Sequence, residues 1–320
     1  MEKRHLGKFL LLAVLLFIAV VFAILNGPVR IPFKELFLEG NRQILYLRLL
    51  RVLLAAITGS GLAVSGAALQ AILRNPLAEP YLLGTSSGAG LGAVLAIITG
   101  LSSFFLPAVS FLGALVSMVF VYYLSKRGNR IPVESFILSG VIVSLLCSAV
   151  IAFLVSVSPN EALHGVVWWL WGSLQMYDVK LLLIAAAIVI PSMAILYVFS
   201  QDLNAVSIGE EDALHLGIKI EKIKKIIFFL TSLITAGLVC VSGVIGFVGL
   251  ILPHITRLWV GPNHRVLLPA SCLLGAVFMI VCDLLARTVY APFEVPIGVI
   301  TACVGAPVFI VLMKNRQRGK

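Results

Sequence analysis

The chain has 320 residues, of which 60% are hydrophobic and 12% are charged. A soluble domain carries about 25% charged residues, so this composition excludes one and predicts an integral membrane protein. The formal net charge is +10, but the basic residues are dispersed over short segments, which argues against a nucleic-acid-binding protein.

The apolar runs are near the roughly 20 residues that a helix needs to cross a bilayer, and they exclude a barrel of short alternating strands. They predict an all-α, polytopic membrane helical bundle in which residues 1–320 form a single transmembrane domain. Ten spans are expected: Leu6–Leu25, Leu49–Leu73, Leu82–Thr99, Phe104–Leu124, Val133–Val157, Val179–Phe199, Ile226–Val241, Val244–Val260, Val266–Ala286 and Val295–Met313. The seventh and eighth could instead be one broken helix, because only Ser242 and Gly243 separate them.

Two segments of the chain resemble each other, Gly61–Pro76 and Gly237–Pro253. Each contains Val-Ser-Gly followed by proline ten residues later. An odd number of expected spans separates them, which would give an inverted repeat of the kind that transporters contain. Chance similarity between segments of small apolar residues is the alternative. We expect helix breaks at two places within these segments, Asn75-Pro76 and Pro253-His254, where His254 either lines a pathway or bonds to a neighbouring carbonyl.

Small residues recur every four positions on the second and third spans, which predicts close helix packing in lipid. They are Ala55, Gly59, Ala63, Ala67 and Ala71 on the second span, and Gly84, Gly88, Gly92, Ala96 and Gly100 on the third. The glycine-rich run in the third span lacks the Lys-Ser/Thr pair of a nucleotide-binding loop, so we expect no ATP bound by this chain.

The five cysteines lie in apolar spans without the spacing of a disulfide framework or a metal site. We therefore predict core packing for them, and neither a metal site nor a cofactor. No catalytic constellation is present either, so the chain is not expected to be an enzyme.

With the amino terminus inside, all but seven of the 24 Lys and Arg residues fall in cytoplasmic segments, which satisfies the positive-inside rule and places both termini in the cytoplasm. The outer exceptions are Arg30, Lys34, Arg42, Arg48, Arg51, Lys180 and Arg287. These side chains either reach lipid phosphates or attract an acidic protein or anionic ligand. Asp283 and Arg287 stand four residues apart, as in a salt bridge within one helix.

The segment 201–225 is the longest charged cytoplasmic stretch. Acidic residues from Glu210 to Asp212 precede Lys222, Lys224 and Lys225, the order that a helix dipole favours. Short helices at the membrane surface are expected here.

Residues 211–217 resemble the E-A-A-x-x-x-G coupling loop of ABC-importer permeases, with Asp212 in place of the first alanine. Three further stretches resemble the FecCD/BtuC-type permease family: Arg74–Ala93, Gly246–Pro269 and Glu294–Ile310. The resemblance extends from Arg48 to near the end of the chain. The stretch Val166–Leu174 is more similar to siderophore and haem members of the family than to cobalamin members.

The resemblance implies a homodimer with its pathway at the dimer axis, two ATP-binding subunits that carry ATP and Mg, and a periplasmic or lipid-anchored substrate-binding protein. It assigns ATPase coupling to Glu211, Asp212, Ala213, Leu214, His215 and Gly217. It assigns docking of the binding protein, on an exposed outer rim, to Arg48, Arg51 and Arg287, and the translocation pathway to Cys147 and Ser148.

The resemblance therefore implies the inner-membrane permease subunit of an importer for a metal chelate, with an iron-siderophore or haem ahead of cobalamin. The alternative is an ion-coupled secondary transporter with inverted repeats. The residues argue against it, because no pair of carboxylates suited to a proton or sodium cycle lies within the spans.

Overall fold

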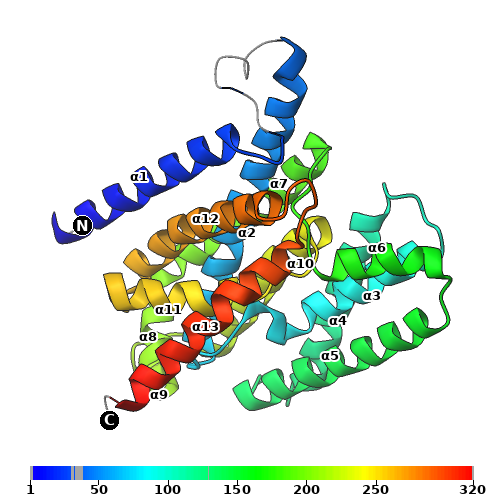
Figure 1. Cartoon of the computed structure of the whole chain (residues 1–320). Helices are drawn as coiled ribbons and strands as arrows, with labels where there is room; N and C mark the ends of the chain where they lie inside the picture. Colours follow the sequence, from blue (N-terminus) through cyan, green and yellow to red (C-terminus); the bar gives the residue numbers. More distant parts are fainter. Residues whose placement is uncertain (1–2, 30–31, 33–38, 129, 319–320) are drawn as a thin grey trace.

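The computed structural model describes residues 3–29, 32, 39–128 and 130–318, so Arg30 and Lys34 lie outside the described residues. All regular elements among the described residues are helical, which confirms the all-α class (Figure 1). The α-helices are α1 (Lys3–Leu25), α2 (Arg42–Ile72), α3 (Thr85–Ile98), α4 (Leu106–Ser125), α5 (Val133–Ser156), α6 (Asn160–Leu170), α7 (Val179–Val198), α8 (Ser200–Ile208), α9 (Glu210–His215), α10 (Ile220–Ser242), α11 (Val248–Val260), α12 (His264–Thr288) and α13 (Ile297–Arg318), and the short 3-10 helices are η1 (Glu39–Asn41) and η2 (Pro80–Leu83).

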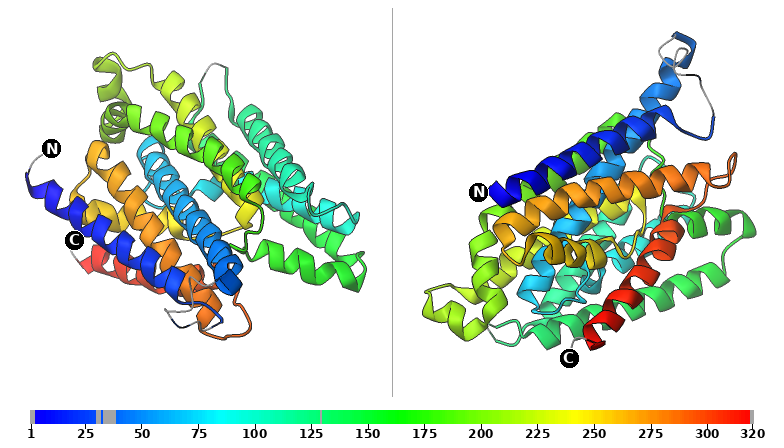
Figure 2. Two further views of the ribbon diagram at one scale, coloured as in Figure 1. Left: turned by 90° about the horizontal axis from the view of Figure 1, so that it is seen from above. Right: turned by 60° about the vertical axis from the view of Figure 1, so that its left-hand side comes forward.

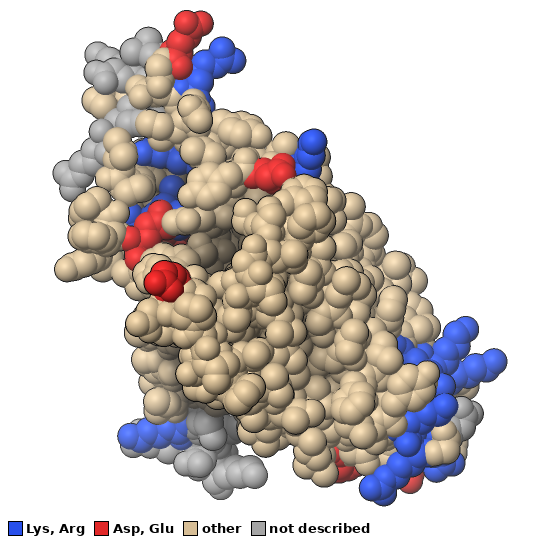
Figure 3. All heavy atoms as spheres, turned by 90° about the vertical axis from the view of Figure 1, so that its right-hand side faces the viewer, with Lys and Arg blue, Asp and Glu red and all other residues tan. Residues whose placement is uncertain are grey.

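Seven of these helices are long and apolar enough to cross a membrane, and α3, α11 and α13 contain shorter apolar helices. Together they correspond to the ten expected segments. Figure 3 shows charged side chains gathered toward two ends of one face, with a broad uncharged surface between them. This distribution fits a protein whose middle is surrounded by lipid.

The helix α2 forms the centre of the bundle, where it packs against α10, α11 and α12. A Cβ atom added at Gly59 would collide with the carbonyl oxygen of Gly275 in α12, and one at Gly66 would collide with that of Gly249 in α11. The absence of side chains therefore lets these backbones touch. The close packing predicted from the small residues is confirmed.

The helices α10 and α11 are separate, with an irregular segment of residues 243–247 between them. Side chains from the segment before α3 form hydrogen bonds with backbone groups of residues 243–247. Glu79 accepts a hydrogen bond from the Phe247 amide at 2.7 Å, and the Tyr81 hydroxyl lies 2.9 Å from both the amide and the carbonyl oxygen of Ile245. The two-helix interpretation of this region is thus confirmed.

The break expected at Pro253-His254 is wrong, because both residues lie inside α11. A proline within a helix leaves the carbonyl four residues earlier without its donor. Here the Gln70 side-chain amide lies 3.5 Å from that Gly249 oxygen and 3.0 Å from the Leu250 oxygen, so a neighbouring helix supplies the missing donor. The break at Asn75-Pro76 is confirmed, since both residues follow the end of α2.

The Val-Ser-Gly similarity does not mark equivalent local structures. Gly66 lies within the helical part of α2, whereas Gly243 follows the end of α10 with φ of 67°. The prolines differ as well, since Pro76 lies in a turn and Pro253 lies in a helix. In this register, the two segments are not a structural repeat.

One helix was not expected, α6, whose eleven residues are too few to span a bilayer. On the outside of the bundle, α1 lies along α12, where Leu12 packs with Leu267 (Figure 2). The start of α1 and the end of α13 both lie at the end of the bundle that carries α8 and α9 (Figure 1). This end is the one expected to face the cytoplasm.

Candidate functional site

Within the expected coupling segment 201–225, residues 201–215 lie in the two short helices α8 and α9, joined at Gly209, and residues 220–225 begin α10. Glu210, Glu211 and Asp212 form the first turn of α9, where carboxylates interact favourably with the helix dipole. Ala213 is fully buried and holds α9 against the bundle. The structure therefore brings the residues of the expected coupling motif together on one exposed helix and the turn that follows it.

The turn after α9 exposes two large apolar side chains at an end of the molecule. Leu214 is 59% exposed and Leu216 is 69% exposed. Gly217 follows with φ of +79°, and a Cβ atom there would meet nothing within 4 Å. Glycine is therefore needed for the left-handed backbone and not for a close approach. Exposed leucines outside the apolar spans are typical of a protein interface.

A groove of about 660 Å³ runs beside α9. Its lining includes Arg74, Glu211, Asp212 and Glu221, together with the buried Lys224 of α10. The Lys224 ammonium lies 2.9 Å from a Glu210 oxygen and 3.4 Å from a Glu221 oxygen. Sequence reasoning placed Lys224 only in a basic tail, although Glu221 and Lys224 have the three-residue spacing of a helical ion pair.

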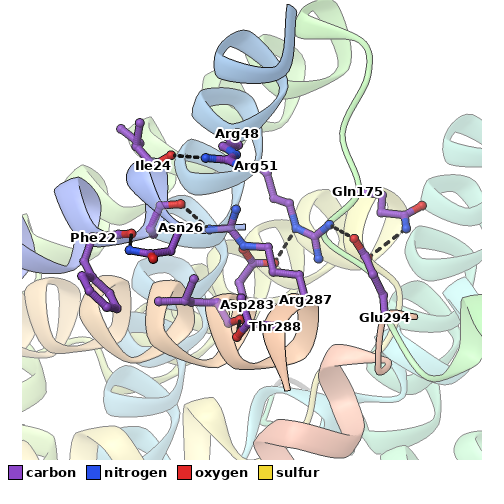
Figure 4. A network of polar contacts seen from close by, with 12 residues as sticks. Phe22, Ile24, Asn26, Arg48, Arg51, Gln175, Asp283, Arg287, Thr288 and Glu294 are labelled. Carbon is purple, nitrogen blue, oxygen red and sulfur yellow. Dashed lines mark hydrogen bonds and ion pairs between the residues drawn. The ribbon is translucent and has the colours of Figure 1, made fainter. Parts of the chain in front are cut away.

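At the opposite end of the bundle, Arg51 of α2 forms the centre of a buried charge network (Figure 4). Its Nε donates to Asp283 of α12 at 2.6 Å, and its NH1 group donates to Glu294 at 2.7 Å. Glu294 also accepts from the Gln175 side chain at 2.9 Å. Burial raises the pKa of Glu294, but the hydrogen bond and charge of Arg51 outweigh burial and hold this pKa below its ordinary value.

The other two expected docking arginines extend the network to α1. Arg48 donates to the carbonyl oxygens of Ile24 and Leu25, at 2.9 and 3.1 Å, and of Val29 at 2.6 Å. Arg287 donates to the Ala23 oxygen at 2.6 Å.

Arg287 also pairs with Asp283 at 3.2 Å, as the four-residue spacing predicted. Arg48 is only 5% exposed and Arg287 only 1%. The prediction of an exposed arginine rim is therefore wrong. It failed because a span count places a residue at a depth but does not say which side chains the neighbouring elements cover.

The network joins elements that are distant in the sequence. It links the end of α1, the first turns of α2, the end of α12, the segment before α13 and the residues after α6. Arg51 and Arg287 pair with the two carboxylates, whereas Arg48 contacts only backbone carbonyl oxygens, so the three arginines give the cluster an excess positive charge. Glu294 and Gln175 were not identified from the sequence, which offers no spacing that relates them.

The two expected pathway residues lie on different faces of α5. Cys147 is buried in the hydrophobic core, whereas Ser148 is exposed. Ser148 shares its exposed surface with apolar side chains such as Leu145, which is 66% exposed. Of the two residues, only Ser148 is placed to contact a pathway outside this chain.

A second cavity, of about 690 Å³, lies between α6, the starts of α4 and α7, and the end of α10. Trp168 and Trp169 contribute to its lining, and the Trp168 ring stacks on His164 with centroids 5.9 Å apart. These tryptophans belong to the stretch Val166–Leu174. The sequence analysis identified this stretch by its resemblance to siderophore and haem members of the family, but it did not predict the cavity.

Comparisons with known proteins identify the family of this chain. The model of the FecCD transport family matches residues 14–315. The cobalamin import system permease protein BtuC of Halobacterium salinarum is 40% identical over 275 residues, covering 85% of this chain and 73% of that protein. The hemin transport system permease protein HmuU of Yersinia pestis is 34% identical over 325 residues, covering 97% of each.

A solved structure described as an inward-facing, metal-chelate type ABC transporter superimposes with a TM-score of 0.90. It is 35% identical in sequence, and the superposition covers 98% of this chain and all of that one. The chain therefore belongs to the FecCD transport family, which comprises permease subunits of type II ABC importers.

Proposed function

We propose that this chain is the inner-membrane permease of an importer for a metal chelate, with haem or an iron-siderophore ahead of cobalamin, energised by two ATP-binding subunits. The observation that carries the proposal is the exposed apolar surface of Leu214 and Leu216 beside the acidic first turn of α9. An exposed apolar patch with a charged edge is suited to a protein partner. This surface lies at the end of the bundle where α1 begins and α13 ends. The proposal assigns that end to the cytoplasm.

Assembly with the ATPase subunit tests this surface. Leu214→Glu is expected to abolish co-purification of the ATPase subunit with the permease, because it places a charge in the centre of an apolar contact. Lys126→Glu is the matched control, since Lys126 is exposed beyond the end of α4. Normal assembly of the Leu214→Glu variant would overturn the ATPase-docking assignment.

On the outer side, we place docking of the substrate-binding protein around Arg48, Arg51 and Arg287, although the three arginines already have partners. The support is the excess positive charge of the network, which attracts acidic side chains. A docking carboxylate would have to compete with Glu294 for Arg51, so docking and rearrangement of the network are coupled.

A second copy of the chain completes the pathway in this proposal. The support is the exposed face of α5, where Ser148 interrupts an otherwise apolar surface. A pathway at the axis between two copies would bring two such faces together, with lipid on the remaining surface. Ser148 rather than Cys147 is then the pathway residue.

The relatives described above are named for cobalamin and hemin, so their names do not separate the two substrates. The substrate preference therefore rests on one observation, the tryptophans at positions 168 and 169 that line a cavity. Aromatic side chains suit a large planar ligand such as haem. No feature of the described site favours the alternative, an ion-coupled secondary transporter. Uptake driven by an ion gradient in the absence of ATP would support that alternative.

A further inference from the structure

One lysine at the cytoplasmic end of α10 is not a surface charge. The side chain of Lys224 is 3% exposed, whereas Lys219 and Lys222 are exposed. A buried lysine is costly unless its ammonium group is paired. Lys224 therefore has a specific structural environment that the other lysines of the segment lack.

Its partners come from three parts of the chain. The ammonium group contacts Glu210 of α9 at 2.9 Å, Glu221 of α10 at 3.4 Å and the Ile131 carbonyl oxygen at 3.4 Å. The other carboxylate oxygen of Glu221 accepts a hydrogen bond from the Ile131 amide at 2.8 Å. Ile131 is fully buried and lies two residues before α5. Lys224 thus links the short helix α9 to the start of α5.

This link matters because α9 has few other attachments to the bundle. A helix of six residues has no independent stability, so its position depends on tertiary contacts. On α9 itself those contacts are the buried Ala213 and the ion pair of Glu210 with Lys224. A displacement of α9 would reach the start of α5 through Lys224 and its hydrogen-bonded partners.

We propose that Lys224 is a positioning residue that transmits movement of α9, when the ATPase subunits bind or hydrolyse ATP, to the first turn of α5. The proposal rests on the proposed function, since α9 is taken as the ATPase contact and α5 as the pathway helix. Lys224 contacts neither ATP nor substrate. Its role is to connect α9 to the start of α5, so that the two move together.

The test uses the full complex in proteoliposomes and measures ligand imported per ATP hydrolysed, with haemin as the probe, or cobalamin where the unmodified complex does not import haemin. Lys224→Gln is expected to lower this ratio about tenfold while ATP hydrolysis continues, because coupling residues shift coupling by modest energies. Lys224→Arg is expected to retain most of the ratio. The matched control Lys126→Gln removes an exposed cytoplasmic lysine and is expected to leave the ratio unchanged.

A ratio for Lys224→Gln equal to that of the unmodified complex would overturn the proposal, and so would a proportional fall of import and hydrolysis. If Lys224→Gln does not assemble, Glu210→Gln removes only the link to α9 and is expected to give the same loss of coupling. Absence of ATP-driven import by the unmodified complex would instead count against the proposed function.

Hydrogen exchange in the assembled complex supplies a second readout that does not depend on import. In the unmodified complex, ATP is expected to change the exchange of α9 and of residues 130–137 together. In Lys224→Gln, only α9 is expected to respond. A response of both segments in the variant would show that the link does not pass through Lys224.

Discussion

The two ends of this permease both contain buried ion pairs, but they are built differently. At the end proposed to face outward, the outer end, Arg51 bridges Asp283 and Glu294, and the cluster joins long helices to one another with an excess of positive charge. At the end proposed to face the cytoplasm, the inner end, Lys224 is shared by two glutamates and attaches a six-residue helix. The outer cluster therefore holds long helices of the bundle together, whereas the inner one attaches a short helix that the proposal takes to move.

The largest loss of stability is expected when the central arginine of the outer cluster is removed. Arg51→Ala leaves the buried Asp283 without its strongest partner, and loss of one member of a buried pair costs about 3 to 5 kcal/mol. The expected result is a large fall in the thermal unfolding temperature of the purified permease. Arg42→Ala, at the exposed start of the same helix, is the control and should change the temperature little. Equal stability of the two variants would mean that the network does not consolidate the bundle.

At the inner end, Gly217→Ala is expected to reduce ATP-driven uptake without unfolding the chain. The left-handed backbone at Gly217 disfavours a Cβ atom by roughly 1 to 2 kcal/mol, and the strain falls on the turn that follows α9. Gly217→Asn is the matched control, because asparagine tolerates this conformation. Uptake by the alanine variant at the level of the asparagine variant would contradict this role of the turn.

The faces of α5 give a smaller and more local effect. With the native cysteines replaced, a cysteine introduced by Ser148→Cys is expected to react with a water-soluble thiol reagent in the assembled complex. The thiol at Cys147, retained alone, is expected to react much more slowly because it is buried. Slower reaction of the thiol at position 148 in the presence of the transported ligand would support the assignment of Ser148 to the pathway. Equal reaction rates at the two positions would contradict that assignment.

The smallest effect is a pH dependence at Glu294. Its pKa is lower in the folded protein than in the unfolded chain, so the ionised carboxylate stabilises the fold above its unfolded pKa of about 4.3. This contribution, of about 1 kcal/mol for a partly exposed pair, is lost as the pH falls through the lower folded value. Unfolding temperatures measured from pH 7 to pH 3 should decline less in Glu294→Gln. Identical declines would place the carboxylate outside the network.

The sequence predicted the membrane bundle well because hydrophobic runs report directly on helices that cross lipid. The ten expected segments agree with the helices to within a few residues at most ends, and the Ser242-Gly243 boundary is correct. The errors have physical causes. Pro253 stays in a helix because Gln70 of another helix supplies a donor to the Gly249 carbonyl oxygen, and α6 was missed because it is too short to span a bilayer.

The functional residues were predicted less completely. A local motif located α9 and its glycine, because those residues are adjacent in the sequence. The partners of Arg51 come from positions more than 200 residues away, and no local pattern relates them. The separation of Cys147 from Ser148 likewise depends on which face of α5 the rest of the bundle covers.

The most direct test of the account is uptake by proteoliposomes that contain the permease, its ATPase subunits and its binding protein. The account predicts that labelled haemin, siderophore or cobalamin accumulates only when ATP is present on the ATPase side, and that the permease alone gives no uptake under a proton or sodium gradient. Uptake by the permease alone, driven by an ion gradient and indifferent to ATP, would contradict the central claim.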